Sequence, residues 1–253
     1  MDILRSLMLS VVFVAVSLSS GAKTFLVSAG VSDYSGYPYK AQSLRLPTSD
    51  AKTIAEIYSV NKRMKNSRGS IDYVLLLDSV ATKEKIIMAM NKVYSKANED
   101  DIVIFFFSGH GFNGGFCAYD GDIYYNDIRK AMANSKSKNK MIFADACRSG
   151  GLRGDRAQSS DTAEADAKKA NVMLLLSSRT NENSIERSDM KNGFFTEYLK
   201  KGLRGNADVN KDRTITAMEL FNFVHNGVKE ISSDKQHPVM WGNFDDNMPV
   251  MKW

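Results

Sequence analysis

Several short segments of the chain are apolar at nearly every position, and amphipathic stretches lie between them. The apolar segments span residues 24–31, 71–77, 102–108, 140–146 and 172–178. Strands that are buried on both faces have this pattern, whereas strands exposed on one face alternate apolar and polar positions. The pattern therefore predicts a mostly parallel sheet with both faces covered.

Apolar residues recur at helical spacing in the intervening stretches. The predicted helices span residues 47–60, 81–97, 126–135, 193–203 and 216–231. Ser49 or Asp50 is placed to cap the first of these, and Thr82 to open the second. Because strands and helices alternate without a repeat or an internal linker, the pattern predicts one α/β domain with helices on both faces of its sheet.

Three segments do not follow this alternation. The glycine-rich residues 111–125 predict a small hairpin, and residues 148–170 are polar and predict an exposed, mobile loop. The tail, residues 236–253, is apolar but has no period, so we expect it to pack on the core.

The N-terminus has the layout of a secretory signal peptide. Arg5 precedes an apolar run over residues 7–18, and Ser20 and Ala22 provide small residues before a cut after Ala22. We therefore divide the chain into a signal peptide, residues 1–22, and a domain, residues 23–253, in a secreted or periplasmic protein. An uncleaved signal segment is the alternative, and it would be the chain's only link to a membrane.

The composition and charge of the chain limit the classes of partner that we expect it to bind. The 253 residues are 43% hydrophobic and 25% charged, with a formal net charge of +5 and a pI near 9.0. No Lys/Arg-rich run is interleaved with aromatic residues, so we expect no nucleic-acid partner. Cys117 and Cys147 are the two cysteines, and in an exported protein a disulfide between them is one alternative.

Reactive side chains follow two of the predicted strands. Residues 108–111 read Ser-Gly-His-Gly, and residues 145–148 read Asp-Ala-Cys-Arg. Sites of parallel α/β sheets lie at the carboxyl ends of strands. If the two strands are neighbours, His110 and Cys147 share one edge, where an imidazole can activate a thiol and protonate a leaving amine. The N–H groups of Gly111 and Cys147 would then form an oxyanion hole.

The two remaining histidines are expected to be structural, since His225 lies within a helical pattern and His237 precedes Pro238 in the tail. His110 is therefore the one candidate for a catalytic histidine.

The two motifs that contain His110 and Cys147 resemble those of a known family. The sequences FFFSGHG and DACRSG are similar to the motifs of the caspase and metacaspase superfamily of cysteine peptidases. The similarity extends over nearly the whole of residues 24–238. It differs from the caspase signature by an aspartate in place of the glutamine before Ala-Cys, and by a shorter separation of histidine and cysteine.

The resemblance implies a single three-layer caspase-like domain and a cysteine-type endopeptidase, with His110 as general base and acid and Cys147 as nucleophile. Metacaspases bind the basic residue before the cut with acidic residues, and the resemblance implies that Asp50 and Asp145 are these acids here. It also implies that Ser108 lies in the same substrate-binding pocket. Two carboxylates would select arginine or lysine before the cut. Asp50 as a plain helix cap is the alternative.

The chemistry requires no cofactor, but the resemblance raises the question of calcium. The acidic stretch expected after the histidine motif holds only Asp120 and Asp122. A second candidate is an EF-hand-like loop with Arg213 where glycine is usual. Its ligand positions would be Asp208, Asn210, Asp212, Thr214 and Glu219. A loop whose aspartate side chains cap the next helix is the alternative.

Self-cleavage is predicted within residues 148–170, because this segment contains several basic residues that the enzyme could cleave after. These residues are Arg148, Arg153, Arg156, Lys168 and Lys169.

Two other functions stay open at this point. The chain could be a catalytically silent caspase-like binding or scaffold module, or a disulfide-bonded exported binding domain. For the peptidase, the expected partners are proteins or peptides with exposed arginine or lysine.

Overall fold

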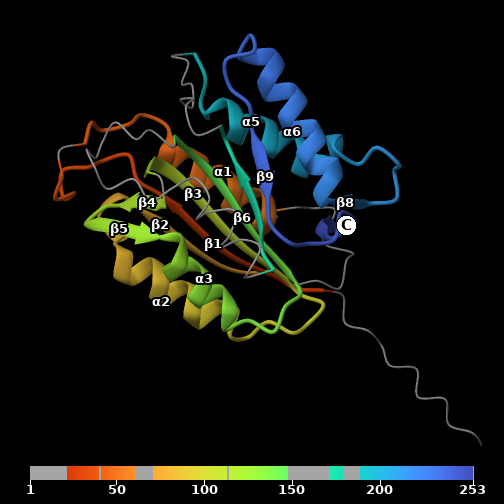
Figure 1. Ribbon diagram of the computed structural model, residues 1–253, viewed down its shortest axis with the longest axis horizontal. Coiled ribbons are helices and arrows are strands. Elements are labelled where there is room, and N and C mark those ends of the chain that lie inside the picture. The colour runs from red at the N-terminus through yellow and green to blue at the C-terminus, as the bar shows by residue number, and fades with distance from the viewer. Residues whose placement is uncertain are drawn as a thin grey trace, which may run out of the picture.

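The computed structural model describes residues 22–39, 41–60, 71–112, 114–147, 171–178 and 189–252, and for Val60 and Cys147 it describes the backbone only (Figure 1). Over these ranges, no helix combines the length and the hydropathy that a membrane span would need.

A mixed sheet with mostly parallel strands forms the middle layer, in the order β2-β1-β3-β6-β7-β9. Pairing is parallel from β2 to β7, and β9 joins β7 antiparallel at the edge. The strands are β1 (Thr24–Gly30), β2 (Ile71–Leu77), β3 (Ile102–Phe112), β6 (Asn139–Cys147), β7 (Met173–Leu176) and β9 (Val239–Trp241). The mostly parallel sheet predicted from the apolar segments is confirmed.

Helices cover both faces of this sheet (Figure 1). One face packs against α2 (Lys83–Tyr94) and α3 (Tyr125–Ala133). The other packs against α1 (Pro47–Val60), α5 (Phe194–Lys201) and α6 (Ala217–Ile231). Each face has its own apolar core, so the domain has the three layers expected for an α/β fold.

The three phenylalanines of β3 belong to both cores. Phe105 and Phe107 pack on the α2 and α3 side, Phe106 packs on the α1 side, and all three are fully buried. Side chains alternate between the faces of a strand, so a strand covered on both faces favours apolar residues at every position. This explains why apolar residues run unbroken up to Ser108.

β3 is longer than predicted and runs to Phe112. Its last residues pair antiparallel with β4 (Gly115–Ala118), which pairs with β5 (Gly121–Tyr124) as the predicted hairpin. His110 therefore lies within the strand instead of beyond its end. The hairpin extends the strand because it supplies backbone partners for Gly111 and Phe112 after the main sheet ends.

The C-terminal tail forms strands that the sequence did not predict. β9 belongs to this tail, and β10 (Pro249–Lys252) pairs with β8 (Thr214–Thr216), which directly precedes α6. These strands have three or four residues each. Such short strands leave no measurable period in the sequence, and their partners are distant along the chain.

Candidate functional site

The register of β3 and β6 brings the two reactive motifs together. In this register His110 pairs with Cys147, and Ser108 pairs with Asp145 two residues earlier. The expectation that the two strands are neighbours is therefore met, and the Cα atoms of His110 and Cys147 lie opposite each other at the carboxyl end of the sheet. The catalytic roles of the two residues stay a prediction.

The ring of His110 is held by the loop that follows β1. Its Nε2 lies 2.7 Å from the carbonyl oxygen of Gln42. Because a carbonyl only accepts, Nε2 carries the proton in this contact and Nδ1 is left as the basic nitrogen. The ring also packs on Tyr34, with centroids 4.6 Å apart. Sequence patterns gave no sign of Gln42, because it acts through its backbone.

Tyr34 fixes the backbone beside His110 as well. The His110 N–H donates to the Tyr34 hydroxyl at 2.6 Å, and this hydroxyl donates to the carbonyl of Cys117 at 3.2 Å. Burial raises the pKa of Tyr34 well above its ordinary value, and the charge of Asp78 adds to the rise. The hydroxyl therefore stays protonated and keeps both contacts.

Gly109 makes this contact sterically feasible. A Cβ at Gly109 would lie 2.5 Å from the Tyr34 hydroxyl, and the φ angle of Gly109 is +153°, a conformation that other residues rarely adopt. The glycine before the histidine is therefore required both by the backbone angle and by the space that Tyr34 occupies.

The loop carrying Tyr34 and Gln42 is tied to the sheet at its start. The backbone N–H groups of Ser32 and Asp33 donate to one carboxylate oxygen of Asp78, at 2.8 and 2.9 Å. The Leu44 N–H donates back to the Ser32 carbonyl at 2.8 Å, which closes the loop on itself. The position of Gln42 thus depends on Asp78, just after β2.

Asp50 and Asp145 form a buried pair of acids beside the two motifs. Their exposed fractions are 2% and 6%, and Ser108 is equally buried at 2%. The Ser108 hydroxyl donates to Asp50 Oδ2 at 2.9 Å. The three residues that sequence reasoning assigned to one pocket therefore lie together, although they come from α1, β3 and β6.

The surroundings of this pair strongly perturb the pKa of Asp50. Burial raises the pKa of Asp50 well above its ordinary value, and the negative charge of Asp145 raises it further. Hydrogen bonds from Asn192, Ser108 and Gly193 act in the opposite direction. Asp50 lies in the first turn of α1, and its side chain points to these partners instead of capping the helix.

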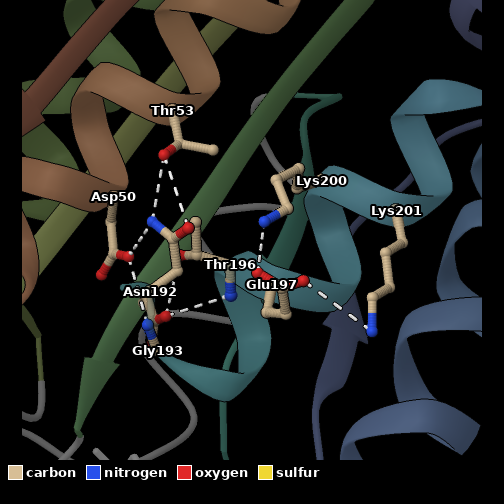
Figure 2. A network of polar contacts seen from close by, with 9 residues as sticks. Asp50, Thr53, Asn192, Gly193, Thr196, Glu197, Lys200 and Lys201 are labelled. Atoms are coloured by element: carbon tan, nitrogen blue, oxygen red, sulfur yellow. Dashed lines mark hydrogen bonds and ion pairs between the residues drawn. The ribbon is translucent and has the colours of Figure 1, made fainter. Parts of the chain in front are cut away.

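Residues around the start of α5 complete the surroundings of the acids, and sequence reasoning missed them. Asn192 donates to Asp50 and also contacts Thr53 (Figure 2). Thr196 donates to Asp145 through its hydroxyl at 2.8 Å. Asparagine and threonine are common helix-capping residues near the start of a helix. The sequence therefore did not indicate that Asn192 and Thr196 contact two acids that are distant along the chain.

The other cysteine and histidines have structural contacts. Cys117 is a buried thiol, so the alternative of a Cys117–Cys147 disulfide is wrong. Its sulfur lies 3.1 Å from the hydroxyl oxygen of Tyr37. His225 Nδ1 lies 2.8 Å from the Pro238 carbonyl oxygen, and His237 Nε2 lies 3.0 Å from Asp234.

The carboxylates of the first calcium candidate are engaged elsewhere. Asp120 accepts the backbone N–H of Lys83 at the start of α2, and Asp122 accepts the Tyr37 hydroxyl. Within the described ranges, no group of three or more His, Cys, Asp or Glu side chains is arranged to hold a metal ion.

The EF-hand-like loop makes its turn despite the arginine. Arg213 adopts a φ of +68°, in the left-handed region where glycine is usual. The Asp208 and Asp212 carboxylates accept the N–H groups of Arg213 and Thr214. Glu219 accepts from Thr216 in the capping box of α6, so Thr216 and Glu219 cap this helix while the two aspartates bond within the loop. Asp208 Oδ1 is buried without a hydrogen-bond partner. Calcium binding stays a prediction.

Two further predictions lie outside the described residues. Residues 1–21, which hold almost all of the predicted signal peptide, are not among them, and neither are residues 148–170, where self-cleavage is predicted.

Comparison with known proteins adds two findings. A family model described as the caspase domain matches residues 30–248. Among solved structures, the chain is similar to the crystal structure of protein GSU0716 from Geobacter sulfurreducens, with a TM-score of 0.61 and 18% identity over 91% of this chain and 97% of that chain. At this identity the likeness concerns the fold alone. No match was found among curated proteins.

Proposed function

The chain belongs to the caspase-domain family, and from this premise we propose that it is an exported cysteine endopeptidase that cleaves proteins after arginine or lysine. Family membership supports a cysteine-type peptidase in general. The finer proposal depends mainly on one observation, the β3–β6 register that pairs His110 with Cys147 and Ser108 with Asp145. Two adjacent strands thus carry both the proposed reactive pair and part of the proposed specificity pocket.

In the proposed mechanism, His110 Nδ1 takes the proton of the Cys147 thiol. The thiolate sulfur attacks the carbonyl carbon of the scissile bond, the C–N bond breaks, and the imidazolium returns the proton to the leaving amine. Water then hydrolyses the thioester with His110 as base. The contact from Nε2 to the Gln42 carbonyl supports this assignment, because it fixes the tautomer and orients the ring.

The oxyanion that forms on the substrate carbonyl would accept hydrogen bonds from the backbone N–H groups of Gly111 and Cys147. Donors of this kind are effective when they are held rigidly before the reaction. Both residues lie in strands, Gly111 opposite Phe116 of β4 and Cys147 opposite His110, which supports the required rigidity.

The preference for basic residues follows from the charge of the pocket. An arginine side chain would lie against Asp50 and Asp145, whose negative charges lie close enough to repel each other. A guanidinium relieves that repulsion and donates charge-assisted hydrogen bonds, whereas an aspartate would add a third negative charge. Export is proposed from the N-terminal pattern of residues 1–22.

An assay on short fluorogenic peptides tests this function. We expect the purified protein to cleave after Arg and Lys and not after Asp, and Cys147→Ala and His110→Ala to lower kcat/KM by about a thousandfold or more. Running each assay with and without calcium tests the calcium prediction at the same time. Cleavage after Asp alone would overturn the pocket assignment.

Covalent labelling separates the peptidase from the silent scaffold. A thiol-reactive peptide ketone ending in arginine should add once to the wild type and to Cys117→Ala, and not to Cys147→Ala. Cys117→Ala is the matched control, since the Cys117 thiol is buried. A wild-type protein that neither cleaves peptides nor takes the label is a binding or scaffold module.

A further inference from the structure

Two acids buried side by side need neighbours that favour their charged forms. Asp50 comes from α1 and Asp145 from β6, and burial and mutual repulsion both favour neutral carboxyl groups at this place. Binding of a basic side chain requires the opposite, because only carboxylates attract a cation strongly. The relevant question is therefore which residues of the chain keep the pair charged and oriented.

One short segment contacts both acids. Asn192 Nδ2 and the Gly193 N–H donate to Asp50 Oδ1, at 2.8 and 3.2 Å. Three residues further on, the N–H and the hydroxyl of Thr196 donate to Asp145 Oδ2, at 3.1 and 2.8 Å. Asn192 and Thr196 are 3% and 0% exposed, so these hydrogen bonds are shielded from water.

These contacts place the start of α5 directly against the acids. Gly193 is the N-cap of α5 and has no side chain to cap it, and Asp145 accepts the N–H of Thr196 in place of such a cap. A Cβ on Gly193 would lie 2.4 Å from Asp145 Oδ2, so a larger residue could not approach as closely. The positive end of the helix dipole then favours the ionised carboxylate.

We propose that Asn192 and Thr196 are positioning residues for substrate specificity, which hold Asp50 and Asp145 ionised and oriented to receive an arginine or lysine side chain. This inference rests on the proposed function and deepens it. The two residues donate to one oxygen of each carboxylate, and Asp50 receives Ser108 on its other oxygen. Neither residue is proposed to touch the scissile bond.

A role limited to anchoring α5 would predict loss of stability alone. The two roles differ in their pH dependence, because a donor that favours a carboxylate lowers the pKa of that group, and its removal makes the group take up a proton at higher pH. Several other charged groups lie near the segment. Glu197 pairs with Lys200 and Lys201 along α5 (Figure 2). Asp189 and Lys191 lie just before Asn192 in the chain, and Arg45 donates to the Met190 carbonyl.

The test uses Thr196→Val, which keeps the shape and removes the hydroxyl, together with Asn192→Ala. For an arginine peptide we expect each variant to raise KM by roughly tenfold to a hundredfold with kcat little changed. The acid limb of kcat/KM should move to higher pH by about one pH unit. Thr196→Ser retains a hydroxyl at this position, so its KM and the pH of its acid limb should match those of the wild type.

Thr82→Val is the matched control. Thr82 is the N-cap of α2, whose core lies on the opposite face of the sheet, and its side chain accepts the N–H of Lys85. Like Thr196→Val, the variant removes a threonine hydroxyl at the start of a helix, but one that contacts no acid of the pair, so it should lower stability without moving KM or the acid limb. If Thr196→Val and Asn192→Ala change KM and the acid limb no more than Thr82→Val does, the positioning role is wrong, whether or not the protein cleaves after arginine.

Binding measured without catalysis separates this inference from the proposed function. In the Cys147→Ala background, calorimetry with N-acetyl-arginine methylamide should show binding that Thr196→Val and Asn192→Ala weaken, more strongly at low pH. If this holds while the wild type cleaves no arginine peptide, the positioning role stands and the peptidase proposal fails. If the Cys147→Ala protein does not bind this ligand at all, the positioning role is overturned.

Discussion

Two buried acids near the carboxyl end of the sheet are subject to opposing demands. Binding a basic side chain requires Asp50 and Asp145 to be charged, while burial favours their neutral forms. Hydrogen bonds from Ser108, Asn192 and Thr196 reduce this conflict without removing it, since the pKa of Asp50 stays raised. Two buried acids therefore lower the free energy of unfolding of the protein, but they also provide a site that can bind a cation.

Asp50→Asn should therefore make the protein more stable and less active. A carboxyl group whose folded pKa lies above its unfolded value stabilises the fold at low pH, and this contribution is lost as pH rises through the folded pKa. The variant removes that loss, so its Tm should exceed that of the wild type at pH 7. The kcat/KM for arginine peptides should fall by about tenfold to a hundredfold, as one charge-assisted partner is removed.

Thermal unfolding at a series of pH values checks this prediction. The Tm of the variant should increasingly exceed that of the wild type as pH rises above about 4, the ordinary pKa of an aspartate, because the buried carboxyl group of the folded wild type resists the ionisation that the unfolded chain undergoes. Equal Tm values for the two proteins at every pH would contradict the electrostatic account of Asp50.

At the scale of elements, the approach of α1 to the sheet decides whether Asp50 reaches its partners. Gly30 ends β1 and pairs with Ser108 of β3. A Cβ at Gly30 would lie 2.4 Å from the carbonyl oxygen of Pro47 and 2.9 Å from the Cβ of Ala51, both in the first turns of α1. The glycine therefore lets the helix start lie directly on the strand ends, with Asp50 beside Ser108.

Gly30→Ala should push this helix start away from the sheet. We expect a loss of about 1–3 kcal/mol in the free energy of unfolding, since the clash is with backbone. KM for arginine peptides should rise as well, because Asp50 moves with the helix. Gly121→Ala is the control, as a Cβ there meets nothing within 4 Å. Urea unfolding curves that coincide for Gly30→Ala and wild type would contradict the close approach.

At the scale of the whole molecule, the proposed nucleophile lies directly before a long connection. β6 ends at Cys147 and β7 begins at Met173, and the basic residues predicted as cleavage sites lie between these two strands. A cut in this connection would leave the pairing of β6 with β7 to hold the two fragments together. Self-cleavage is therefore compatible with retention of the folded sheet.

We expect the incubated wild type to separate into two fragments on a denaturing gel while migrating as one species under native conditions. Intact mass should place the cut after Arg148, Arg153, Arg156, Lys168 or Lys169, because the proposed pocket accepts basic residues. Cys147→Ala should stay whole in the same incubation. Identical masses for the two proteins would exclude self-processing.

The amino-acid sequence by itself determined the layers of the domain and the order of its main elements. Unbroken apolar runs of this length are typical of strands in a covered parallel sheet, and amphipathic stretches are typical of helices that lie on such a sheet. This pattern predicted β1, β2, β3, β6 and β7 and the five described α-helices, although the edge strand β2 is only partly buried. It also placed the histidine and cysteine motifs at the carboxyl end of two such strands.

Tertiary structure alone decided the rest, because contacts between distant segments leave no local pattern. The carbonyl of Gln42 beside His110 carries no side-chain signature, and the short strands β8, β9 and β10 exist only through distant partners. Whether Asp50 caps a helix or joins a buried pair depended on which segment packs against it. That outcome follows from burial and charge in three dimensions, which the order of residues does not encode locally.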